Sequence, residues 1–318
     1  MIEYLIIQLD DTSTSYCHYE NPRRKENLIG LDTLKSGILF AMKENLMIQF
    51  VYPDYKLPTE YEEVIESIDH SKIISSVCED KTLTDETDVL VYNDWGDFSL
   101  GRFEKGKSYV LRTSKTDLFD RFLSINDILS KVTRLNIVIT DIDTFKEEDF
   151  NKYKQILVVF SEHLEKLYTE RESPQFNILT DRIMLSAMNS CGAGESNITL
   201  APNGKFYVCP AFYLENENDC VGDLKIGLDI KNKQLYKLDH APICSHCDAY
   251  QCKRCIWLNR KTTLEVNTPS HEQCVLAHLE RNASKELLQN IRKHGTFFPE
   301  QEIKEIDYLD PFDKRNEW

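Results

Sequence analysis

The stretch CSHCDAYQCKRC, at residues 244–255, contains two C-x2-C pairs separated by four residues. Eight of the ten cysteines lie between Cys191 and Cys274, and this group opens with a C-x12-G-x4-C spacing through Gly204 to Cys209. A C-x2-C turn holds two thiolates on one side of a tight loop, at a separation that one metal centre can bridge. The grouping therefore predicts bound metal in the C-terminal half of the chain.

The short gap between the pairs favours iron over zinc. A zinc ribbon also uses two such pairs, but with ~12 to 20 residues between them so that two knuckles face each other. Four residues favour a compact iron–sulfur site or two neighbouring ones, with Cys274 and the Cys191/Cys209 pair completing them. A zinc site, and a cysteine-rich knuckle that only staples a small domain, stay open as alternatives.

Charge and composition exclude several classes of protein. The net charge is −15, whereas nucleic-acid binding requires a basic surface, so no nucleic-acid partner is expected. The N-terminus has no basic region followed by a cleavage site, and no apolar run approaches the ~20 residues that span a bilayer. We therefore expect a cytoplasmic protein without membrane contact, where cysteine clusters are more often metal ligands than disulfides.

The first 180 or so residues alternate short apolar runs with amphipathic stretches, which is typical of βα units and a parallel sheet. Roughly six units predict an α/β fold with an open or partial (β/α) barrel. We expect strands around 4–9, 47–52, 72–77, 89–92, 108–112, 136–139 and 175–179. We expect helices around 31–43, 62–68, 125–132 and 147–170.

The composition changes at Ser190, where short strands, turns and cysteines begin. Residues 202–204, Pro-Asn-Gly, predict a turn between two arms of a hairpin, 197–201 and 205–209. A helix is expected from about His278 to Lys293. The prediction is thus a (β/α) domain over 1–185, a small cysteine-rich α+β domain over 186–295, and an acidic tail over 296–318.

Two segments carry a resemblance to a known family. CGAG at residues 191–194 and ITLAPNGKFYVC at 198–209 look like the opening of a SPASM domain, the auxiliary-cluster domain of many radical SAM peptide maturases. The family pattern continues with C-x2-C-x5-C-x3-C and a final cysteine, whereas this chain has x4 and x2 in those places. The resemblance covers about 85 residues.

The resemblance implies the metal ligands. One 4Fe–4S cluster would be held by Cys244, Cys247, Cys252 and Cys274. A second would be held by Cys191, Cys209 and Cys255, with an open iron or a fourth ligand such as Cys220. One or two clusters are therefore expected, no further cofactor is implied, and the residues of any catalytic step stay unknown.

The N-terminal half lacks the motif of a radical SAM enzyme. Such an enzyme needs C-x3-C-x2-C after its first strand, because three thiolates leave one iron free to chelate S-adenosylmethionine. The corresponding loop, DDTSTSYCHY at residues 10–19, contains only Cys17. The region therefore resembles a degenerate radical-SAM-like barrel, and we expect no S-adenosylmethionine chemistry from this chain alone.

Together these features resemble the CXXX repeat peptide maturase family. The resemblance implies maturation of a ribosomally synthesised, post-translationally modified peptide of Cys-x-x-x repeats. The chain would be a maturase or accessory subunit rather than a stand-alone radical SAM enzyme, with a radical SAM enzyme and the cysteine-rich precursor as partners. The alternative is a non-catalytic peptide-binding or scaffold module with structural zinc.

Histidines and loop acids are weaker candidates. His246, inside the first C-x2-C turn, is interpreted as a donor beside the ligands or as a solvent-facing residue. His271 and His278 flank Cys274 and could substitute as ligands, although the preferred interpretation is that they are ordinary surface or helix histidines. Four aspartates follow predicted strands, where barrel active sites are built, although loop acids of so acidic a protein are usually solvated: Asp10, Asp11, Asp141 and Asp143.

Overall fold

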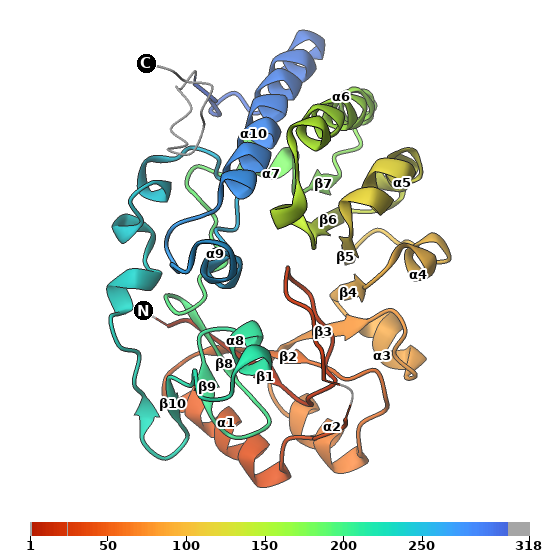
Figure 1. The fold of residues 1–318 in the computed structure, drawn as a ribbon. Helices are drawn as coiled ribbons and strands as arrows, with labels where there is room; N and C mark the ends of the chain where they lie inside the picture. Colours follow the sequence, from red (N-terminus) through yellow and green to blue (C-terminus); the bar gives the residue numbers. More distant parts are fainter. Residues whose placement is uncertain (1, 24, 305–318) are drawn as a thin grey trace. The chain divides into compact units, whose positions relative to one another are not determined.

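The computed structural model describes residues 2–23 and 25–304, and its contacts divide the chain into two compact units. The first unit takes in the chain up to Gly101 together with Gly192–Lys237. The second unit takes in Arg102–Cys191 and the chain from Leu238 onward. Each unit is thus assembled from two separate stretches (Figure 1).

The first unit contains a mostly parallel sheet of strand order β4-β3-β2-β1-β8-β9. β1 pairs in parallel with both β2 and β8, and only the β8–β9 hairpin is antiparallel. The strands are β1 (Tyr4–Gln8), β2 (Met47–Val51), β3 (Ser71–Ser75), β4 (Val89–Tyr92), β8 (Asn197–Leu200) and β9 (Phe206–Tyr207), and a small separate pair is β10 (Gly222–Asp223) with β11 (Gly227–Leu228).

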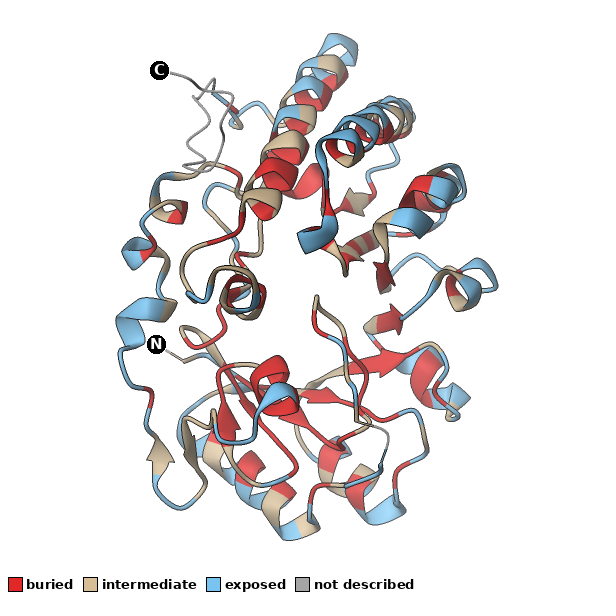
Figure 2. Cartoon of the chain, in the orientation of Figure 1, coloured by how far each residue is buried: buried red, intermediate tan, exposed pale blue. Residues whose placement is uncertain are grey.

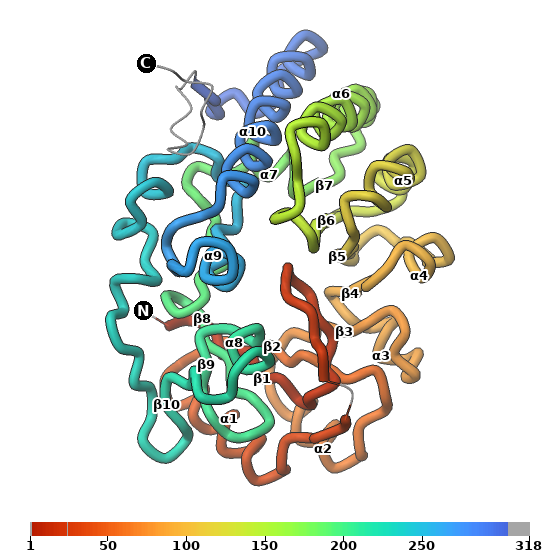
Figure 3. The backbone as a smooth tube through the Cα atoms, viewed as in Figure 1, coloured from red at the N-terminus to blue at the C-terminus, as the bar shows by residue number. Residues whose placement is uncertain are grey.

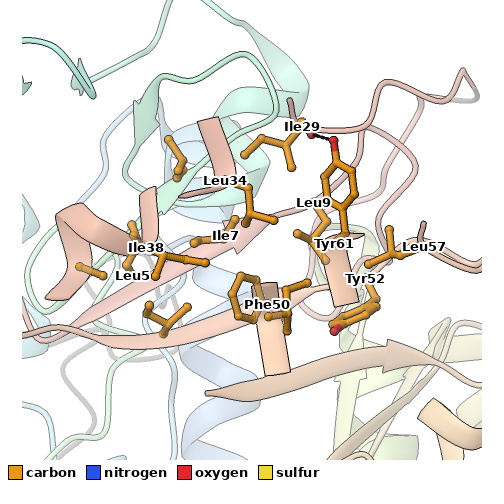
Figure 4. Packing of buried hydrophobic residues seen from close by; sticks show 14 of the residues in the cluster. Leu5, Ile7, Leu9, Ile29, Leu34, Ile38, Phe50, Tyr52, Leu57 and Tyr61 are labelled. Carbon is orange, nitrogen blue, oxygen red and sulfur yellow. Dashed lines mark hydrogen bonds between the residues drawn. The ribbon is translucent and has the colours of Figure 1, made fainter. Parts of the chain in front are cut away.

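Helices follow the first four strands of this unit and cover its core. The inward positions of β1, which alternate with period two, are Leu5 and Ile7, and Leu9 follows them beyond the strand. They pack against Leu34 and Ile38 of α1, as Figure 4 shows. The helical segments are α1 (Leu31–Lys43), α2 (Thr59–Glu66), α3 (Lys81–Glu86), α4 (Trp95–Ser99), α8 (Pro210–Glu215) and η3 (Lys233–Tyr236).

The second unit contains three parallel strands in the order β7-β6-β5 and two long helices. The strands are β5 (Ser108–Thr113), β6 (Arg134–Ile139) and β7 (Gln175–Phe176). The α-helices are α5 (Lys115–Ile128), α6 (Glu147–Thr169), α7 (Thr180–Met184), α9 (Ile256–Thr263) and α10 (His271–Ile291). Short 3-10 turns are η1 (Leu129–Lys131), η2 (Ile142–Thr144), η4 (Leu238–His240), η5 (Cys244–His246) and η6 (Arg292–His294).

Helices α6 and α10 pack along each other and bury one face each (Figure 2). On α6 the buried residues recur at helical spacing, with Phe150, Tyr153 and Leu157 in the first half. On α10 the buried face also includes the ionisable residues Glu280 and Arg281. Burial of such groups requires partners. Tyr153 of α6 donates to Glu280, and further partners lie in the cysteine loop, which we define as residues 244–255.

The predicted alternation of strand and helix is confirmed. Within the described residues each of the strands β1 to β7 is followed by the α-helix of the same number, α1 to α4 in the first unit and α5 to α7 in the second. The hairpin is also confirmed, since Gly204 turns with φ +75° between β8 and β9. Sequence inspection did not predict that β8 also joins the parallel sheet beside β1.

The predicted boundaries at 185 and 295 differ from the contact units, because 192–237 groups with the N-terminal stretch. A separate SPASM-like domain therefore stays a prediction. Of the predicted acidic tail, residues 305–318 lie outside the described residues. In the part of the chain that is described, no helix is both long enough and apolar enough to cross a membrane.

Candidate metal centre

The cysteine loop is bounded by two helical turns. Cys244 opens the 3-10 turn η5, and Cys255 is the residue that caps the N-terminus of α9. Cys274 lies in the first turn of α10, where Ser270 accepts a hydrogen bond from the Gln273 amide and fixes the start of the helix. The four cysteines predicted for the first cluster all belong to the second unit.

Two backbone amides of the cysteine loop point at a sulfur. The Ala249 amide lies 3.4 Å from Cys247 Sγ, and the Arg254 amide lies 3.5 Å from Cys252 Sγ. Each donor is two residues beyond the cysteine that it contacts, which is the second cysteine of the first pair and the first cysteine of the second pair. Hydrogen bonds of this kind stabilise the thiolate, which is the form that binds metal.

Burial opposes that thiolate form when no cation is bound. Burial, together with a smaller contribution from the nearby Cys247 thiol, raises the pKa of Cys244 to about 11. Burial likewise raises the pKa of Cys252 to about 12, with added contributions from Cys244 and Cys247. The three thiols are therefore within electrostatic reach of one another, and a bound cation would displace their protons.

The donor chemistry fits a thiophilic metal. Soft thiolates in paired C-x2-C turns are ligands of iron–sulfur clusters and of zinc. Within residues 2–23 and 25–304, no three Cys, His, Asp or Glu side chains are gathered closely enough to hold a metal ion. The ligand set named from the sequence thus stays a prediction, supported by the amide–sulfur contacts and the proximity of the thiols.

The three candidate histidines have different surroundings. His278, one turn after Cys274 on α10, places Nε2 3.4 Å from Cys247 Sγ. His271 stacks edge-on against Phe150, with ring centroids 6.2 Å apart. His246 is exposed on η5. His278 thus contacts a predicted ligand, whereas the role of a donor beside the thiols was predicted for His246.

The cysteines predicted for a second cluster are divided between the units. In the second unit, the Cys191 amide donates to the Lys253 carbonyl at 3.0 Å, which places Cys191 beside the second C-x2-C turn that ends at Cys255. In the first unit, Cys209 caps α8 and Cys220 lies near Tyr207. This second ligand set remains a prediction.

The loop between β1 and α1, described at residues 9–23 and 25–30, is named here the β1 loop, and Figure 3 traces the course of these residues. Asp10 is fully buried, and its carboxylate accepts from the amides of Thr12 and Asn27, both at 2.7 Å. Asp11 accepts from Tyr213 Oη of α8 at 2.5 Å and from Arg23 Nη1 at 3.0 Å. These two carboxylates therefore hold the loop together.

Arg23 and Tyr213 extend this network. The Arg23 guanidinium lies 4.2 Å from the centre of the Tyr213 ring, and its Nη2 donates to the Tyr213 carbonyl at 3.2 Å. Burial raises the pKa of Tyr213, and the Asp11 carboxylate raises it further, so the phenol stays a hydrogen-bond donor. The β1 loop is thus tied to α8, the helix that Cys209 caps.

Sequence reasoning missed the charged residues that surround the cysteine loop. Asp248, inside the loop, pairs with Arg182 of α7 and Arg281 of α10. One signal was present in the sequence: Cys274, His278 and Arg281 are spaced i, i+4 and i+7, which places them on one face of a helix.

Solved structures of similar fold belong to anSMEcpe, an anaerobic sulfatase-maturating radical SAM enzyme with a SPASM domain. The hexahistidine-tagged enzyme with bound AdoMet gives a TM-score of 0.60 at 11% identity, covering 92% of this chain and 96% of that one. The native enzyme with bound AdoMet and Cp18Cys peptide gives 0.60 at 10% identity, covering 92% and 100%. The chain therefore has a radical-SAM-like fold.

No family model and no curated protein matches the chain. Membership of the CXXX repeat peptide maturase family accordingly stays a prediction.

Proposed function

We propose that this chain is an iron–sulfur protein that takes part in the maturation of a ribosomally synthesised peptide, as a cytoplasmic partner of a separate radical SAM enzyme. The observation that carries the proposal is the cysteine loop, with its close thiols and amide–sulfur contacts, in a chain of radical-SAM-like fold. One solved structure of this fold is of an enzyme with a bound peptide, and this supports a peptide substrate for the chain.

In this proposal Cys244, Cys247, Cys252 and Cys274 bind a 4Fe–4S cluster, and a second cluster uses the ligand set that the SPASM resemblance implies. A bound cluster supplies one-electron transfer. The chain's own part is to bury the Cys244 thiol and to donate amide hydrogen bonds to the sulfurs of Cys247 and Cys252. The partner enzyme supplies the S-adenosylmethionine chemistry, because the β1 loop contains a single cysteine, Cys17.

Metal content after anaerobic purification tests the cofactor. Two 4Fe–4S clusters predict about eight irons per chain and a broad absorbance near ~400 nm, and one cluster predicts about four irons. Replacing Cys255 by Ala should remove about half of the iron if there are two clusters. Cys17→Ala is the matched control and should retain all of it. Loss of all iron, or of none, in the Cys255 variant contradicts the division of ligands.

The peptide claim has its own test. A synthetic peptide of Cys-x-x-x repeats should be retained by the immobilised, reduced protein. The same peptide with Ser in place of every Cys is the control and should pass through if thiols are recognised. Absence of binding by the cysteine peptide would count against a role in peptide maturation, whatever the metal content.

A second candidate function is a peptide-binding or scaffold module with structural zinc. The contact between Cys247 Sγ and His278 Nε2 favours it, because mixed cysteine and histidine ligands are common in structural zinc sites. A colourless protein with one zinc per chain, lost on replacing His278 by Ala, would support this candidate and contradict the iron–sulfur proposal.

A further inference from the structure

The residue that follows the first C-x2-C pair is fixed by two buried arginines. The Asp248 carboxylate accepts from Arg281 Nη2 at 2.7 Å, from Arg281 Nε at 3.0 and 3.1 Å, and from Arg182 Nη2 at 3.1 Å. The arginine side chains are only 1% and 3% exposed. These three residues, named here the Asp248 clamp, join the cysteine loop to α7 and α10.

Two further residues of the four-residue gap, Tyr250 and Gln251, are also held by side-chain contacts. The Tyr250 ring faces the Arg182 guanidinium, whose carbon lies 4.3 Å from the ring centre. Gln251 Nε2 donates to the Ala277 carbonyl of α10 at 2.7 Å and to Glu280 Oε2 at 3.2 Å. The short gap is therefore attached to the body of the second unit along its length.

These anchoring contacts use no cysteine side chain. A charge-assisted, multiply bonded Arg–carboxylate contact is among the stronger polar interactions in proteins. Removing one partner of a buried pair leaves an uncompensated buried charge, which is strongly unfavourable. The contacts that hold the gap are thus made by its own residues with α7 and α10.

We infer that Asp248, Arg182 and Arg281 are positioning residues that hold the cysteine loop in its folded shape before any metal binds. The role of these residues rests on the proposed metal site, whereas the contacts that they make do not depend on it. In classical zinc fingers metal binding and folding are one event. Here the two events are separate, so metal can be removed from the loop and restored without unfolding it.

Hydrogen exchange of the full-length, chelator-treated protein tests the inference. Peptides that cover the cysteine loop should stay protected in the metal-free wild type, with exchange rates close to those of the metal-loaded protein. Replacing Asp248 by Ala should accelerate exchange in the metal-free loop by about tenfold or more, because the gap loses its anchor. Glu172→Ala, which removes an exposed partner of Lys105 in the same unit, is the control and should leave the loop unchanged.

A loop that exchanges as fast in metal-free wild type as in the Asp248 variant overturns the inference, because metal would then be what orders it. Circular dichroism shows whether the Ala variant is folded. If it is not, Asp248→Asn, which keeps the side-chain volume, decides by the same measurement and should accelerate exchange to a smaller extent. If the purified protein contains no metal, the proposed function is wrong. The exchange experiment would still show whether the Asp248 clamp orders the cysteine loop.

Discussion

The β1 loop and the cysteine loop are each held by an aspartate paired with arginine, but the two arrangements leave different groups available. In the β1 loop, the Asp11 carboxylate is occupied by Arg23 and Tyr213, and the network lies within the loop and α8. In the cysteine loop, the aspartate is bound by arginines of two helices outside the loop, and the thiols, which form no disulfide, are the candidate metal ligands. The same kind of ion pair is therefore made within the β1 loop but between the cysteine loop and two helices outside it.

Of the changes considered, removal of Arg281 should reduce stability most. Arg281→Met takes a fully buried cation from Asp248, and we expect a loss of about 3–5 kcal/mol in the free energy of unfolding of the second unit. Denaturant unfolding followed by hydrogen exchange measures it. Lys105→Met, at an exposed ion pair, is the control and should cost at most about 1 kcal/mol. Equal losses in the two variants would show that the clamp contributes little.

Glu280, which accepts a hydrogen bond from Gln251, gives a pH-dependent test. Burial raises its pKa to about 7, so its carboxyl stays protonated in the folded protein at pH values where the unfolded chain, with a pKa of 4.5, has lost that proton. The unfolded state therefore binds fewer protons between pH 4.5 and 7, and stability falls as pH rises, by up to about 1.4 kcal/mol per pH unit.

Glu280→Gln should remove this part of the pH dependence, as urea unfolding between about pH 4.5 and about pH 7.5 would show. Glu286→Gln, on the exposed side of the same helix, should keep the wild-type slope. An unchanged slope in the Glu280 variant would mean that this carboxyl ionises alike in both states.

Tyr213→Phe should have the smallest effect on stability, and this effect should be limited to the β1 loop. The change removes the hydroxyl that donates to Asp11, and we expect a loss of about 2 kcal/mol, typical of a hydrogen bond to a charged group. Tyr4→Phe, at a partly exposed position of β1, should change stability by less than about 0.5 kcal/mol. Faster exchange in the cysteine loop of the Tyr213 variant would show that the two loops are not independent.

Apolar periodicity predicted some elements with correct bounds and misplaced others, among them α5, which begins at Lys115 and not near residue 125. Helix α1 and strand β4 have the predicted bounds, because their apolar residues recur at clear helical or strand spacing. The start of α10 was predicted wrongly at His278, because the helix begins seven residues earlier at His271. Its first turns bury Gln273 along with apolar residues, and this weakens the apolar pattern. The short helices α3 and α4, capped by Asp80 and Asp94, were not predicted.

The cysteine spacing identified the candidate metal ligands, which stay a prediction, and gave no sign of the charged residues that surround them. The cysteine spacing named Cys244, Cys247 and Cys252, which the structure brings within electrostatic reach of one another. The clamp could not be predicted from spacing alone, because Arg182 lies 66 residues before Asp248 and Arg281 lies 33 residues after it.

Residue type and spacing determined the local features: two C-x2-C pairs of candidate ligands, a single cysteine in the β1 loop, and a glycine where the β8–β9 turn requires positive φ. These are local properties of the chain. The pairing of β8 with β1 and the enclosure of Asp248 by two distant arginines became visible only in the folded protein. Long-range pairing and the burial of charge depend on which segments meet in space, and local spacing does not specify those meetings.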